Sequence, residues 1–157
     1  MIRIEVPATS ANLGSGFDAL GIALNKYNRV WMEEWDSVEI SSVDNTKIPT
    51  DTSNLIFWAA NYLYESCGHK LPGLKILQEN NIPMARGLGS SSACIVAGIL
   101  GANRMLGNPL SQEDLINLAA QIEGHPDNTS PAIAGGLVTS AIEGKRVYSV
   151  SVPVSDK

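Results

Sequence analysis

The stretch Pro83-Met-Ala-Arg-Gly-Leu-Gly-Ser-Ser-Ser-Ala93 leads straight into an apolar run that ends at Leu106. Its glycines, at positions 87 and 89, let the backbone turn tightly and come close to a ligand. Apolar residues in the run recur at helical spacing with small residues between them, so we predict a helix that is buried on most sides. The N-terminus of this helix would open onto the glycine-serine loop.

A glycine-rich loop in front of a helix is typical of a phosphate site. The backbone N–H groups of the first helical turn lack partners, and the helix dipole adds partial positive charge there. Ser90, Ser91 and Ser92 add hydroxyls that can bond phosphate oxygens or reach a magnesium ion. One serine would suffice as an N-cap, so three of them favour a phosphate site over a plain capped loop. The pattern is not the Walker loop, because no Gly-Lys-Ser/Thr follows.

Composition and charge narrow the class of protein. A chain of 157 residues, 44% hydrophobic and 17% charged, is long enough for one domain with a real core. The net charge of −5 and the lack of a Lys/Arg cluster argue against a nucleic-acid partner. No run reaches the roughly 18 apolar residues of a membrane span. Cys67 and Cys94 are read as buried thiols, so we predict a cytoplasmic protein with no membrane segment.

Apolar spacing also predicts the other elements. Ser53 or Asn54 can cap the first helix, and Ser111 can cap the last, which Gly124 then closes. Pro7 is expected to end the first strand. The predicted strands cover residues 2–6, 30–32, 38–40, 74–78, 138–142 and 147–152, and the predicted helices cover 55–67, 93–106 and 112–123.

A second loop of small and polar residues, Ala8-Thr-Ser-Ala-Asn-Leu-Gly-Ser-Gly-Phe-Asp18, follows the first strand. Loops of this kind often carry function. Asn12 and Asp18 can form Asx-type turns in a simple connector, or they can contact a polar substrate. The residues themselves leave both interpretations open.

The segment Glu123-Gly-His-Pro-Asp-Asn128 lies at the end of a predicted helix. A carboxylate at a helix C-terminus is opposed by the helix dipole, so Glu123 is poorly placed for stability alone. A cation would explain it, because magnesium takes one or two carboxylates together with phosphate oxygens and waters. An exposed loop without function is the alternative, and His-Pro-Asp alone does not outweigh it.

Together these three stretches resemble the motifs of the GHMP kinases and, within them, the homoserine kinase family. The loop 83–93 is similar to the ATP-phosphate motif of the superfamily. The strings Pro-Ala-Thr-Ser-Ala-Asn-Leu-Gly-x-Gly-Phe-Asp and Glu-Gly-His-Pro-Asp-Asn, the second followed by Ser130-Pro-Ala-Ile and Gly-Gly136, narrow the resemblance to homoserine kinases. The resemblance implies transfer of a phosphoryl group from ATP to the hydroxyl of L-homoserine, in threonine biosynthesis.

For ATP and magnesium, the resemblance implies that the loop holds the phosphates and that the corner before residue 55 borders the adenine. Glu123 is the implied magnesium ligand, together with Ser91 or Ser92. The implied ATP-binding residues are Pro83, Met84, Ala85, Arg86, Gly87, Leu88, Gly89, Ser90, Ser91, Ser92, Ala93 and Asn54.

For the second substrate, the resemblance implies a homoserine pocket near residues 12–18 and 125–128. The implied homoserine contacts are Asn12, Asp18, His125 and Asn128. The implied catalytic residues are Asp127, as candidate general base, and Asn128. An alcohol proton can also leave late to the phosphate itself, so a base is not obligatory.

The resemblance implies an α+β fold, the GHMP kinase N-terminal domain, which is ribosomal protein S5 domain 2-like, with a mixed sheet and helices on one side. Homoserine kinases are close to twice as long, and their third, glycine-rich motif and substrate-carboxylate arginines have no match here. We therefore expect residues 1–157 to be the N-terminal ATP-binding domain, with the C-terminal GHMP domain absent from this chain. Alone, the chain should bind ATP weakly and phosphorylate homoserine poorly, and an uncovered sheet face leaves a homodimer open.

Two other functions fit part of the pattern. Another GHMP small-molecule kinase, of the mevalonate type, would share the phosphate loop, but Asn12-Leu-Gly14 argues against it. A non-catalytic nucleotide-binding or RNA-binding module could share the fold, but the acidic charge and the segment 123–128 argue against that.

Overall fold

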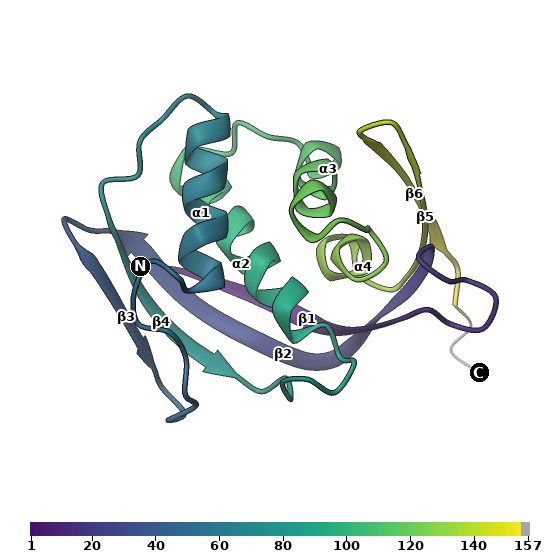
Figure 1. Cartoon of the computed structure of the whole chain (residues 1–157), viewed down its shortest axis with the longest axis horizontal. Helices are drawn as coiled ribbons and strands as arrows, with labels where there is room; N and C mark the ends of the chain where they lie inside the picture. The colour runs from purple at the N-terminus through teal and green to yellow at the C-terminus, as the bar shows by residue number, and fades with distance from the viewer. Residues whose placement is uncertain (155–157) are drawn as a thin grey trace.

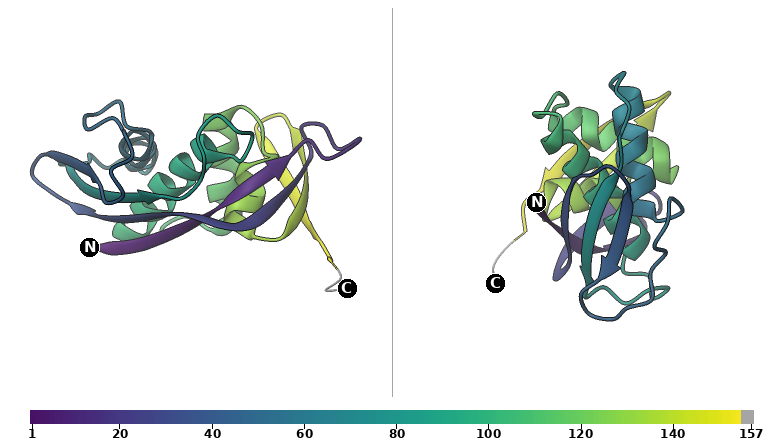
Figure 2. Two further views of the ribbon diagram at one scale, coloured as in Figure 1. Left: turned by 90° about the horizontal axis from the view of Figure 1, so that it is seen from below. Right: turned by 90° about the vertical axis from the view of Figure 1, so that its left-hand side faces the viewer.

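The long strand β2 (Leu20–Glu34) forms the spine of a mixed sheet in the computed structural model, which describes residues 1–154 (Figures 1 and 2). Within these residues, four helices cover one face of the sheet. The predicted mixed sheet with helices on one side is thereby confirmed. The other strands are β1 (Ile2–Ala11), β3 (Val38–Ser42), β4 (Leu74–Asn80), β5 (Leu137–Glu143) and β6 (Arg146–Val152), and the helices are α1 (Leu55–Ser66), α2 (Ser90–Met105), α3 (Gln112–Glu123) and α4 (Thr129–Ala134).

Two groups of strands meet on β2. β1 runs antiparallel to almost the whole of it. On its other side β2 pairs with β4 through residues 28–34 and with β5 through residues 20–22. β3 lies parallel to β4, and β6 is the hairpin partner of β5. A single 15-residue strand therefore holds both ends of the sheet together, where the sequence indicated only a short strand around residues 30–32.

The prediction that Pro7 ends the first strand is wrong. Pro7 lies inside β1 and pairs with Tyr27. The next residue, Ala8, pairs with Leu24, so two residues of β2 bulge out at this point. A proline has no N–H to donate, and a bulge is a place where a strand tolerates that loss. β1 therefore continues to Ala11 and carries part of the expected loop into the sheet.

The core lies between the sheet and the helices. Val6, Val30, Met32 and Ile76 are fully buried on the helix-facing side of their strands. α2 crosses behind them and is buried over most of its length, as its small and apolar residues predict. Burial of such side chains supplies most of the stabilisation of a domain of this size.

Glycines bring α2 close to its neighbours. A Cβ atom added at Gly98 would lie 2.4 Å from the carbonyl oxygen of Ile56 in α1. One added at Gly101 would lie 2.0 Å from the sulfur of Met32 in β2. α2 is thus wedged between α1 and the sheet at a distance that side chains at these two positions would not permit.

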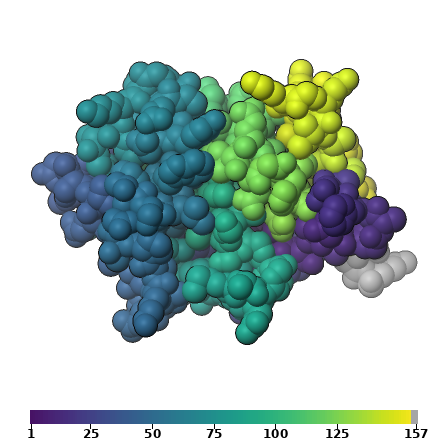
Figure 3. Space-filling view, viewed as in Figure 1, coloured from purple at the N-terminus to yellow at the C-terminus, as the bar shows by residue number. Residues whose placement is uncertain are grey.

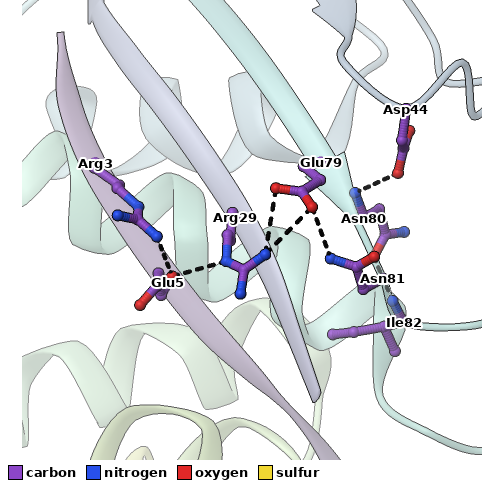
Figure 4. A network of polar contacts seen from close by, with 8 residues as sticks. All are labelled: Arg3, Glu5, Arg29, Asp44, Glu79, Asn80, Asn81 and Ile82. Atoms are coloured by element: carbon purple, nitrogen blue, oxygen red, sulfur yellow. Dashed lines mark hydrogen bonds and ion pairs between the residues drawn. The ribbon is translucent and has the colours of Figure 1, made fainter.

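The opposite face of the sheet carries charge (Figure 4). Glu5 Oε1 accepts hydrogen bonds from Arg3 Nη2 at 2.6 Å and from Arg29 Nε at 2.8 Å. Arg29 Nη1 in turn donates to Glu79 Oε1 at 3.2 Å, so the ion pairs cross β1, β2 and β4. Among the described residues, this face carries the half-buried Trp31 and Leu77 beside the charged side chains. The homodimer stays a prediction.

The helix ends follow the capping signals. Asn54 caps α1, because its Oδ1 accepts from Ile56 N at 2.9 Å. Ser111 and Asp114 form a capping box at the start of α3. α4 has no counterpart among the predicted helices, because its six residues are too few to show a helical period.

The structure describes the two cysteines and the apolar character of the helices. Cys67 and Cys94 are both free thiols, and both are half-buried where full burial was predicted. In the described part of the chain, no helix has the length and apolar character needed to cross a bilayer.

Gly98→Ala and Gly101→Ala form a matched pair, because alanine raises helix propensity by about 1 kcal/mol at either site. At Gly98 the new Cβ meets backbone, and at Gly101 it meets the flexible Met32 side chain. We expect Gly98→Ala to lower the free energy of unfolding by about 1–3 kcal/mol and Gly101→Ala to lower it clearly less, in urea denaturation followed by circular dichroism. Equal losses of unfolding free energy in the two variants would show that α2 packs no more tightly against α1 than against Met32.

Candidate functional site

The N-terminus of α2 begins inside the glycine-serine loop. Gly89 is the N-cap, with φ of 64° in the left-handed region and no side-chain cap bond. Ser90, Ser91 and Ser92 form the first helical turn, so a serine N-cap is excluded. The first helical hydrogen bond runs from Ala93 N to Gly89 O at 2.8 Å. The amides of residues 90–92 therefore have no acceptor within the helix and are available to an anion.

β1 and the start of α4 form the wall behind this turn. Thr9 N donates to Leu88 O at 3.2 Å, and Thr9 Oγ1 donates to Asn128 Oδ1 at 2.8 Å. A Cβ atom on Gly89 would lie 2.2 Å from Thr9 Oγ1. Only glycine fits here, for its backbone angle and for its lack of a side chain. The loop thus packs closely against β1 and the start of α4.

The predicted magnesium residues separate into two groups. Ser92 is buried, and its Oγ donates to Glu123 Oε1 at 3.0 Å. Ser91 is exposed and lines a neighbouring cavity instead. Glu123 ends α3, where its own helix dipole opposes it, but it lies beside the N-terminus of α2, whose dipole favours it.

This donor set fits a metal that arrives with phosphates. Within residues 1–154, no three His, Cys, Asp or Glu side chains come together to hold a metal by themselves. Magnesium does not need such a cage, because one or two carboxylates, substrate phosphates and waters complete its shell. The Ser92–Glu123 pair beside free helix amides offers one carboxylate and one hydroxyl.

The segment after α3 is a tight polar cluster. Asp127 is 1% exposed, and its Oδ1 accepts from Asn128 N at 2.9 Å and lies 2.5 Å from His125 Nδ1. A Cβ atom on Gly21 of β2 would lie 1.8 Å from Asp127 O, so this glycine lets the segment pack onto the sheet. A buried carboxylate that accepts two hydrogen bonds fixes the orientation of both donors.

Asn12 and Asp18 lie in the loop between β1 and β2. Both are exposed and have left-handed backbone angles, with φ of 58° and 55°. Asn12 Oδ1 accepts from Asp18 N at 2.9 Å, which is the turn-forming role of the simpler interpretation. In residues 1–154, no hydrogen bond joins either side chain to the segment 125–128. Their loop projects beyond the end of β1 and β2 (Figure 1).

Beside the loop lies a cavity of about 260 Å³, between the start of α1, the end of β4 and the first turn of α2. Met84 and Ala85 from the glycine-serine loop line it, together with Asn54 from the corner before α1. Asn54 is almost buried, and its Nδ2 donates to Pro49 O at 2.9 Å, so its amide shapes the wall. Figure 3 shows residues 47–55 and 84–91 as neighbouring surfaces.

The rest of the loop is more open. Pro83, Arg86 and Gly87 are exposed, whereas Leu88 is half-buried and packs against the core. Nothing lies within 4 Å of a Cβ atom added at Gly87, in contrast to Gly89.

Asp44 ties one wall of the cavity to β4 (Figure 4). Its Oδ2 accepts from Asn80 N at 2.9 Å, and its Oδ1 accepts from Ser42 Oγ at 2.6 Å. Asn80 Nδ2 then donates to Ser90 Oγ at 3.3 Å, so this chain of contacts reaches the first turn of α2. The hydrogen bond from Ser42, followed by those from Thr46 and Asn80, lowers the pKa of Asp44 from 3.8 to about 2.

Thr9 and Asn80 were not among the predicted site residues. Thr9 stands inside the first motif string, and Asn80 ends a predicted strand just before the loop. Their positions beside the glycine-rich stretches are the only signal in the sequence, because the contacts themselves depend on strand pairing.

The family comparison decides which kind of domain carries this site. Residues 54–136 match the family model described as the GHMP kinases N terminal domain. The chain belongs to the GHMP kinase family. The matched segment contains both the glycine-serine loop and the cluster at residues 123–128.

Relatives extend the likeness over nearly the whole GHMP domain. A homoserine kinase from Caldicellulosiruptor bescii is 48% identical over 156 residues, covering 98% of this chain and 51% of that protein. A solved Listeria monocytogenes structure, assigned as a homoserine kinase, gives a TM-score of 0.86 at 42% identity over 96% of this chain and 53% of its own. The Methanococcus jannaschii mevalonate kinase shares the fold alone, with a TM-score of 0.73 at 19% identity over 96% of this chain and 56% of its own. The chain thus spans about half the length of these relatives.

Asp44→Asn tests how the cavity wall is held. The folded-state pKa of Asp44 lies below its ordinary value, so its charge stabilises the fold above about pH 4, and this contribution is lost as the pH falls towards about 2. We expect Asp44→Asn to lower the urea midpoint at pH 6, with the difference from wild type narrowing from about pH 4 to about pH 2. Asp36→Asn controls for loss of a surface charge. A difference that does not change with pH would show that the charge of Asp44 plays no part.

Proposed function

We propose that this chain forms the nucleotide-binding part of a homoserine kinase, which uses ATP to phosphorylate the hydroxyl of L-homoserine. One observation carries the proposal: the free amides of α2, the Ser92–Glu123 pair and the His125–Asp127–Asn128 cluster meet at one place. Thr9 links the loop to this cluster, because its N donates to Leu88 O and its Oγ1 donates to Asn128 Oδ1 at 2.8 Å. The relatives named homoserine kinase support the choice of acceptor.

The phosphate side of the reaction would rest on backbone and hydroxyl groups. ATP bound here supplies the phosphoryl group, and magnesium bound with it neutralises charge. The amides of residues 90–92 orient the phosphate oxygens, while Ser92 and Glu123 hold the metal. Met84, Ala85 and Asn54 enclose the adenine in the cavity beside the loop. Positioning and charge stabilisation are most of what phosphoryl transfer asks of a protein.

The acceptor side would rest on the segment after α3. Asn128 and His125 orient the homoserine hydroxyl, and Asp127 fixes both of them through its Oδ1. Asp127 is our candidate for accepting the hydroxyl proton, although the proton can also pass to the phosphate itself. Asn12 and Asp18 would contact the amino acid from the loop between β1 and β2. Free thiols at Cys67 and Cys94 suit the cytoplasmic setting that we propose with it.

The first test is a coupled assay of ADP formation by the full-length gene product, with L-homoserine and mevalonate as alternative acceptors. Gly89→Ala is compared with Gly107→Ala, because both glycines have left-handed backbone, with φ of +64° and +82°. Only at Gly89 does the new Cβ meet a neighbour, at 2.2 Å from Thr9 Oγ1. We expect homoserine-dependent activity in the wild type and in Gly107→Ala, and a loss of ATP affinity of about tenfold or more in Gly89→Ala.

Two outcomes would contradict this proposal. Activity with mevalonate but not with homoserine would move the enzyme to another branch of the family. Unchanged ATP affinity in a folded Gly89→Ala protein would show that the phosphates bind elsewhere.

Glu123→Gln tests the metal carboxylate. Glutamine can still accept the hydrogen bond from Ser92, but it lacks the charge that a magnesium ion requires. We expect turnover at limiting magnesium to fall about a hundredfold or more, which is roughly 3 kcal/mol of transition-state stabilisation. Glu113→Gln removes the same charge from the exposed start of α3 and should leave the magnesium dependence unchanged. Near-wild-type turnover of Glu123→Gln would mean that Glu123 only pairs with Ser92.

A further inference from the structure

The cavity beside the loop has a polar floor. Gln78, in β4, lines this cavity and is 2% exposed, although it occupies a core-facing position of a central strand. Asn28, in β2, lies under it and is fully buried. Buried amides cost stability unless their hydrogen bonds are made. One such amide at the cavity and a second in contact with it therefore call for an explanation.

The Gln78 amide is held from below in one orientation. Its Nε2 donates to Asn28 Oδ1 at 3.1 Å and to Cys94 Sγ at 3.5 Å. Asn28 Nδ2 donates to the same sulfur at 3.5 Å. Burial raises the pKa of the Cys94 thiol, so the sulfur stays neutral while it accepts these contacts. In this arrangement the N–H₂ end of the Gln78 amide faces Asn28 and Cys94.

The other end of the amide has no partner in the protein. Within residues 1–154, no group donates a hydrogen bond to Gln78 Oε1. The fully enclosed side-chain atoms without a partner are hydroxyls of Thr129, Ser130 and Ser140, and Gln78 Oε1 is not among them. Since Gln78 lines the cavity, this carbonyl oxygen borders its open space as a free acceptor.

We propose that Gln78 is a specificity-determining residue that selects adenine over 6-oxopurines in the nucleotide. This inference rests on the proposed ATP site and goes beyond it. Adenine presents an amino donor at carbon 6, where guanine and hypoxanthine present a carbonyl acceptor. An amide oxygen locked toward the base accepts a hydrogen bond from the amino group and faces the carbonyl with an unpaired acceptor.

The test measures the binding of ATP, ITP and GTP to the full-length gene product by isothermal titration calorimetry. ITP differs from ATP only in the pattern of donors and acceptors around carbon 6 of the base. We expect wild type to bind ATP about tenfold or more tightly than ITP, since one hydrogen bond and one unpaired acceptor separate them. Gln78→Met keeps the bulk of the side chain without the acceptor, and should bring the ATP-to-ITP ratio close to one.

Met84→Ala is the matched control, because Met84 lines the same cavity with an apolar side chain. It should weaken all three nucleotides alike and leave their ratio unchanged. Equal binding of ATP and ITP by wild type would overturn the role of Gln78 while leaving the proposed kinase intact, whether or not Gln78→Met folds. Tighter binding of ITP or GTP would also overturn it, because the amide would then present its N–H₂ group. Failure to bind any of the three would overturn the proposed function together with this inference.

Discussion

The close approach of α2 to β1 sets the geometry around the glycine-serine loop. Gly89 fits against Thr9 only because it has no side chain, and Thr9 in turn bonds to Leu88 and to Asn128. One threonine thus connects the loop, the sheet and the start of α4. Free amides held in this way are already in place before an anion arrives, so binding does not have to order them first.

The proposed polyphosphate site is compatible with the net charge of −5 because it relies on backbone amides. Salt screens the repulsion between the protein's net charge and an anion beyond about 8 Å. The amides at a helix N-terminus attract the anion at contact distance, where this screening is weak. Two helix dipoles act in opposite directions on the carboxylate of Glu123. It stands at the unfavourable end of α3 and beside the favourable end of α2, close enough to accept a hydrogen bond from Ser92.

Much of this architecture could be predicted from local sequence signals. Helical spacing and small residues gave α2, and Asn54, Ser111 and Gly124 marked helix ends where the structure has them. The prediction from Pro7 was wrong because β2, the partner strand, bulges opposite this proline. The local sequence around Pro7 does not show which strand pairs with it. The roles of Thr9 and Gln78 could not be predicted for a related reason. Their contacts depend on strand pairing and on the packing of α2 on the sheet. The roles of the predicted site residues stay predictions. The structure joins Ser92 to Glu123 and Asp127 to both His125 and Asn128, and it joins the Asn12 side chain to the backbone of Asp18.

Thr9 and Asn128 are 119 residues apart in the chain, yet their side chains share one hydrogen bond behind the loop. Contacts between such distant residues form late in folding, because earlier local contacts have to offset the entropy of closing the intervening chain. During synthesis, the glycine-serine stretch leaves the ribosome as a bare peptide, well before the residues that complete its wall. The proposed phosphate site is therefore complete only in the finished fold, and a nucleotide bound there would stabilise only chains that have reached that fold.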